Sequence, residues 1–125
     1  MRNLFLFAAI AVLSTSPAAA AVTSPLDATQ KAWCEANGPA MSAALSRNYD
    51  ADWAAADDLD ARSPGNAEVE KLHTLAINEM GAAAKIDDFY PGDKPGEDAV
   101  KAFLALDHLA LIKKADTCLP PNLQY

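Results

Sequence analysis

The last strong helical pattern of the chain, residues 97–118, constrains the fold most, because it holds the densest run of large apolar residues and ends at a cysteine. At helical spacing, one stripe of this segment carries Val100, Phe103, Leu104, Leu111 and Cys118. Asp107 falls on the same stripe. A buried carboxylate needs a partner or a shifted pKa. We therefore expect Asp107 to be buried and to pair with a group on another helix, such as His73.

Residues 1–21 have the pattern of a secretory signal peptide. Arg2 supplies a positive start, residues 4–13 form an apolar run, and residues 18–21 are four alanines suited to cleavage. The apolar run is too short to span a bilayer as a helix. We therefore expect an exported protein, periplasmic or secreted, with a single helical domain over residues 22–125 and no membrane span after cleavage.

The chain contains two cysteines, Cys34 and Cys118. In an exported protein such a pair favours a disulfide, and only one intramolecular pairing is possible. The bridge would enclose most of the mature chain and contribute roughly 4 to 5 kcal/mol in the loop-entropy view. A metal-binding thiol pair and an intermolecular bond are the alternatives, but the C-x-x-C spacing typical of thiol metal sites does not occur.

Helical periodicity and turn signals predict an all-α fold, a small antiparallel bundle of three long helices and a shorter N-terminal helix. The expected ranges are 26–37, 40–61, 67–86 and 97–118. Gly38-Pro39 is expected to end the first range, and the turn at residues 63–66 to precede the third. The second range could be one helix or two, since Asn48 and Asp50 are able to interrupt it.

The formal net charge of −7 argues against nucleic acid or an anionic membrane as a partner. It is compatible with cations, basic surfaces or simple acidic solubility. Another exported protein is the partner that the sequence favours, and the oligomeric state stays open. Haem attachment through C-x-x-C-H is excluded because the motif is missing, and we expect no cofactor.

Four polar residues lie on or beside apolar helix faces and are candidates for a buried polar cluster or a ligand site. They are Asp52, His73, Glu79 and Asp107. For Asp52, a carboxylate at the rim of the core is the simpler interpretation. No catalytic residue is assigned, although Asp107 with a histidine could form an acid–base pair.

One E-x-x-H motif, formed by Glu70 and His73, resembles the motif that di-metal carboxylate bundles carry on two helices. The other histidine, His108, has Ala105 three residues before it and not a glutamate. Glu70, His73 and His108 are therefore weak metal candidates, and a histidine hydrogen-bonded at a helix surface is the alternative.

Phe89 and Tyr90 stand among acidic and Pro-Gly residues in the loop expected at 87–96. They are candidates for an interaction surface or for a lid over the end of the bundle. The sequence thus predicts a non-enzymatic exported protein that binds a macromolecule or protects the cell envelope. A ligand or metal carrier using the inward Asp, His and Glu residues is the alternative.

Overall fold

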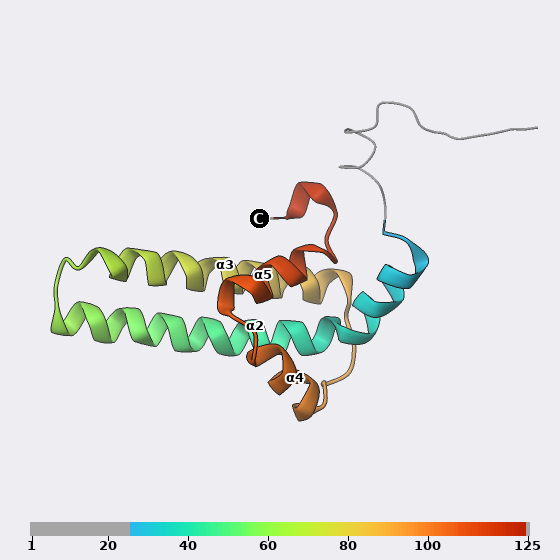
Figure 1. Cartoon of the computed structure of the whole chain (residues 1–125), viewed down its shortest axis with the longest axis horizontal. Coiled ribbons are helices and arrows are strands. Elements are labelled where there is room, and N and C mark those ends of the chain that lie inside the picture. The colour runs from blue at the N-terminus through green and yellow to red at the C-terminus, as the bar shows by residue number, and fades with distance from the viewer. Residues whose placement is uncertain (1–25, 125) are drawn as a thin grey trace, which may run out of the picture.

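The computed structural model describes residues 26–124, so the predicted signal peptide lies outside the described residues. The elements are α2 (Ala28–Arg62), α3 (Ala67–Phe89), α4 (Glu97–Leu104), α5 (His108–Asp116) and the 3-10 turn η2 (Pro121–Leu123). Figure 1 shows α2 and α3 side by side as two long helices, with α4 and α5 near their middle. The all-α prediction is confirmed. The predicted lengths are wrong, since two helices are long and two are short.

Helix α2 runs through Gly38-Pro39, where the sequence predicts an end. Proline lacks an N–H, so the carbonyl of Glu35 loses its partner in the helix. Residue 35 is exposed, and water can solvate that carbonyl. The helix therefore continues past Pro39, and Figure 1 shows it bent in this region, as expected at a proline. Asn48 and Asp50 do not interrupt it.

The turn after α2 forms where the sequence predicts it. Gly65 has φ of +80°, a conformation that glycine adopts without strain. Asn66 is the N-cap of α3 and its side chain accepts a hydrogen bond from the backbone N–H of Glu68. Helix α3 ends at Phe89, three residues beyond the predicted end, which makes Tyr90 its C-cap.

The single helix predicted over 97–118 is wrong, because the chain breaks between α4 and α5. Asp107 is exposed and is the N-cap of α5, accepting hydrogen bonds from the backbone N–H groups of Leu109 and Ala110. Aspartate competes for backbone N–H groups and favours such positions over a helix interior. The predicted burial of Asp107 and its pairing with His73 are therefore both wrong.

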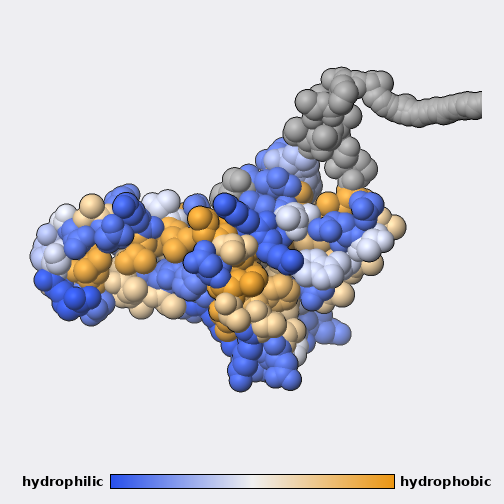
Figure 2. Space-filling view, in the orientation of Figure 1, coloured by the Kyte–Doolittle hydropathy of each residue, from blue (hydrophilic) through white to orange (hydrophobic). Residues whose placement is uncertain are grey.

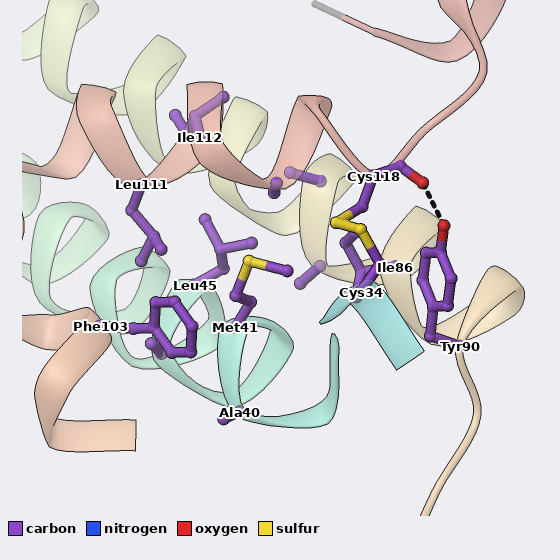
Figure 3. Packing of buried hydrophobic residues seen from close by; sticks show 14 of the residues in the cluster. Cys34, Ala40, Met41, Leu45, Ile86, Tyr90, Phe103, Leu111, Ile112 and Cys118 are labelled. Atoms are coloured by element: carbon purple, nitrogen blue, oxygen red, sulfur yellow. Dashed lines mark hydrogen bonds between the residues drawn. A yellow bond between two sulfur atoms is a disulfide. The ribbon is translucent and has the colours of Figure 1, made fainter. Parts of the chain in front are cut away.

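The core lies where all four helices meet. Its largest side chains come from α2 (Met41, Leu45), α3 (Ile86), α4 (Val100, Phe103) and α5 (Leu111, Ile112). Figure 3 shows most of them together with the disulfide. Breaking the last helix lets α4 and α5 approach this core from different directions, which one straight helix could not do.

The predicted disulfide between Cys34 and Cys118 is confirmed, with its sulfur atoms 1.99 Å apart. It joins the beginning of α2 to the end of the α5 segment. Next to it, the hydroxyl of Tyr90 donates a hydrogen bond to the carbonyl oxygen of Cys118, as Figure 3 shows. Within residues 26–124, no helix combines the length and the apolar character that crossing a membrane requires.

Candidate metal centre

Three potential metal ligands from three helices meet beside the core. They are Asp52 of α2, Glu79 of α3 and His108 of α5. The Nδ1 atom of His108 lies 2.7 Å from Oδ2 of Asp52 and 3.5 Å from Oε2 of Glu79. One ligand atom from each residue lies within 4.8 Å of the other two. Atoms this close can bind one ion together.

The fold positions each of the three side chains. Asp52 and Glu79 lie on the facing sides of α2 and α3, whose pairing is the most extensive in the molecule. His108 is the first residue of α5, directly after the N-cap Asp107. The break in the last helix therefore sets the direction in which the imidazole points.

Burial differs sharply within the site. Glu79 is 0% exposed and Asp52 is 7% exposed, whereas the side chain of His108 is 37% exposed. Among the described residues, neither carboxyl oxygen of Glu79 meets a hydrogen-bond partner of good geometry. An unsatisfied buried carboxyl group is costly, and in a native fold it calls for an explanation.

The pKa of Glu79 is raised to about 9, chiefly by burial, and further by a hydrogen bond that only protonated Glu79 can donate to Asp52 and by the negative charge of Asp52. Two carboxylates cannot hydrogen-bond to each other, because both only accept. A protonated Glu79 can donate to Asp52, and this is the form that burial favours. A bound cation would neutralise the two carboxylates in place of that proton.

The structure therefore brings together two of the four predicted polar candidates, Asp52 and Glu79, with the weak metal candidate His108. Asp107 is not a ligand but caps the helix that carries His108. The continuous helix predicted over 97–118 placed His108 in its middle. Asp107 is a residue type that favours the N-cap, and this signal indicates a new helix that begins at His108.

The E-x-x-H motif does not form a metal cluster within the described residues. Glu70 is exposed. His73 lies on the outer part of the α2–α3 pair, with Nε2 3.4 Å from Oδ1 of Asp57 and its ring 4.4 Å from the ring of Trp53. His73 is thus a histidine hydrogen-bonded near a helix surface, the alternative interpretation of the motif.

Phe89 and Tyr90, the candidates for an interaction surface or a lid, differ in their burial. Phe89 is exposed, but Tyr90 is buried against the core. A pocket of about 520 Å³ lies elsewhere, lined by Leu26, Gln30, Trp33, Lys114 and Thr117. Its charged group, Lys114, stands over the ring of Trp33, and no carboxylate or histidine is among these lining residues. It therefore offers no set of metal ligands.

Comparisons with protein-family models, curated proteins and solved structures find no match to this chain. The function must therefore be argued from the geometry of the site.

Proposed function

We propose that this protein is an exported metal-binding protein that holds a metal ion between Asp52, Glu79 and His108. One observation carries the proposal: Glu79 is wholly buried, its ionised carboxylate meets no hydrogen-bond donor among the described residues, and it faces a carboxylate and an imidazole. A bound cation would satisfy Glu79 and neutralise the charges of both acidic residues.

Export is part of the proposal. The predicted signal peptide supports it, and so does the disulfide, since disulfides persist in oxidising compartments. We also propose that the helices form a small antiparallel bundle built around α2 and α3. Sites for metal ions in such bundles are built from side chains on facing helices.

The test is a calorimetric titration of the purified, untagged, chelator-treated protein with Zn²⁺, repeated for Asp52→Asn, Glu79→Gln and His108→Gln. We expect one ion per chain, and at least about tenfold weaker binding in each variant. Mutating even a residue that only hydrogen-bonds to a metal ligand typically weakens metal binding by about tenfold or more. The absence of binding to the unmodified protein would overturn the proposal.

The structure offers a matched control on the same two long helices. His73→Gln and Asp57→Asn alter the other aspartate–histidine pair, which lies partly exposed and has no buried glutamate. We expect both variants to bind the ion as the unmodified protein does. Equal weakening by these controls would place the ion elsewhere and contradict the assigned ligands.

A second candidate function, the binding of another macromolecule, is supported by exposed apolar side chains. Ile77 is 57% exposed, and Met80 and Leu109 are also exposed. Figure 2 shows hydrophobic residues gathered among hydrophilic ones along one face. Copurification of a protein that is lost in the Ile77→Gln, Met80→Gln double variant would support this function, and its retention would contradict it.

A further inference from the structure

We infer that the site selects a divalent first-row transition-metal ion, with Zn²⁺ as the representative probe, over Ca²⁺ and Mg²⁺. The inference rests on the proposed function and deepens it by naming the class of ion. The chemistry of the three ligands, their number and spacing, and the burial of each support it.

The imidazole nitrogen of His108 favours a transition-metal ion. Nδ1 of His108 points at both carboxylates, so an ion lying between Asp52 and Glu79 also meets an imidazole. Imidazole suits zinc, copper, iron and nickel, whereas Ca²⁺ and Mg²⁺ take oxygen ligands. Some catalytic zinc sites also mix nitrogen and carboxylate ligands, with two histidines and one glutamate.

The site offers fewer oxygen ligands than Ca²⁺ needs. Ca²⁺ takes about 6 to 8 oxygen atoms, which proteins supply largely from loops with free backbone carbonyls. Asp52 and Glu79 lie inside long helices, where the neighbouring carbonyls accept helical hydrogen bonds. The helices therefore withhold the backbone oxygens that Ca²⁺ would need, and two carboxylates alone leave it poorly coordinated.

The distances between the ligand atoms suit an ion of the size of Zn²⁺. Ligand atoms about 2.0 to 2.2 Å from a zinc-sized ion lie about 3 to 3.5 Å apart in tetrahedral or octahedral arrangements. The separation of 3.5 Å between His108 and Glu79 already matches this value. The separation of 2.7 Å between His108 and Asp52 is that of a hydrogen bond, so these two atoms must part by a few tenths of an ångström. A half-exposed ring at a helix start can make such an adjustment.

The site is closed on one side and open to water on the other. Glu79 forms the closed floor of the site, and the 37% exposed side chain of His108 forms its outer edge. Three protein ligands would leave at least one coordination position open, and His108 is the ligand beside which water can reach the site. Sites with an open position exchange ligands, unlike closed structural zinc sites with four protein ligands. This arrangement suits a carrier that takes up and releases its ion.

The experiment measures the affinities of Zn²⁺, Mn²⁺, Ca²⁺ and Mg²⁺ in separate titrations of the untagged, chelator-treated protein. We expect Zn²⁺ to bind at least about 100-fold more tightly than Ca²⁺ or Mg²⁺, and Mn²⁺ to lie between them, following the ligand preferences and the order of the divalent series. Comparable affinities for Zn²⁺ and Ca²⁺ would overturn the inference and leave the proposed function intact. If no ion binds, both fail.

A matched variant tests the role of the nitrogen. His108→Asp replaces the imidazole by a third carboxylate, and we expect the ratio of Zn²⁺ to Ca²⁺ affinity to fall at least about tenfold. An unchanged ratio would overturn the inference. Circular dichroism checks that the variant folds, and the absorption spectrum of the Co²⁺ form gives a second readout. We expect a visible band in the unmodified protein that changes in His108→Asp; an identical band in both would show that the imidazole is not a ligand.

Discussion

Gly38 of α2 lies directly against Tyr90 at the end of α3, so that a Cβ atom at position 38 would be 2.8 Å from Cβ of Tyr90. Real Cβ atoms do not approach this closely, and the neighbouring atom belongs to the rigid part of a buried side chain. The absence of a side chain at position 38 therefore lets α2 and the end of α3 pack together beside the disulfide.

We predict that Gly38→Ala lowers the free energy of unfolding by about 1 to 3 kcal/mol, because overpacking outweighs the better helix propensity of alanine. Urea unfolding followed by circular dichroism measures the change. Gly96→Ala is the control for crowding, since a Cβ there meets nothing within 4 Å; alanine at this N-cap of α4 costs only the difference in capping. Equal losses in the two variants would contradict the packing argument.

Removal of the disulfide tests what holds the end of the chain. We expect the Cys34→Ser, Cys118→Ser double variant to lose about 2 to 5 kcal/mol of stability, in the range seen for native disulfides of small domains. The loss is measured by urea unfolding, with the unmodified protein in reductant as a second route to the same state. If neither route reduces stability, the bridge contributes nothing to the fold.

Removal of one hydroxyl tests the contact beside the bridge. Tyr90→Phe deletes the hydrogen bond to the carbonyl oxygen of Cys118 and leaves that carbonyl without this donor. We predict a loss of about 0.5 to 1.5 kcal/mol in the free energy of unfolding. Because the ring stays, packing against Gly38 is kept, and a much larger loss would show that the ring had moved.

Glu79 makes stability depend on pH in the absence of metal. Burial and Asp52 raise its pKa in the folded chain to about 9, above the ordinary value of 4.5 that applies when unfolded. The folded protein therefore holds a proton that the unfolded chain releases. The resulting stability is complete below pH 4.5 and is lost as pH rises toward 9.

This dependence is measured by chemical unfolding between pH 6 and pH 8 in the presence of a chelator. Glu79→Gln should flatten it, because the neutral amide donates to Asp52 without titrating. The same slope in Glu79→Gln and in the unmodified protein would assign the effect to another group.

Asp107 caps α5 and directly precedes His108, one of the three proposed metal ligands. Asp107→Ala removes the acceptor for two backbone N–H groups, and we expect a loss of about 0.5 to 2 kcal/mol in stability. Because His108 is the next residue, we also expect weaker Zn²⁺ binding. Asp107→Asn should preserve both properties, since asparagine caps as well as aspartate. Failure of the asparagine variant would mean that the charge, and not the cap, is needed.

Much of the local structure could be predicted from the sequence, because it depends on short-range chemistry. Two cysteines allow a single intramolecular pairing, and Cys34 and Cys118 form it. Asp27 and Asn66, residue types that favour the N-cap position, accept the hydrogen bonds that begin α2 and α3.

The sequence by itself thus determined the helical class, the bridge and the approximate starts of α2, α3 and α4, whereas only the tertiary structure decided how the helices divide and which polar groups meet. Helical period places a side chain on a face but does not say which other face it will contact. Pro39 stays within α2 because Glu35 there is open to water, and Asp107 ends a helical pattern because a new direction improves core packing. Asp52, Glu79 and His108 meet in a fold where the last helical pattern divides, because His108 is the first residue of the new helix.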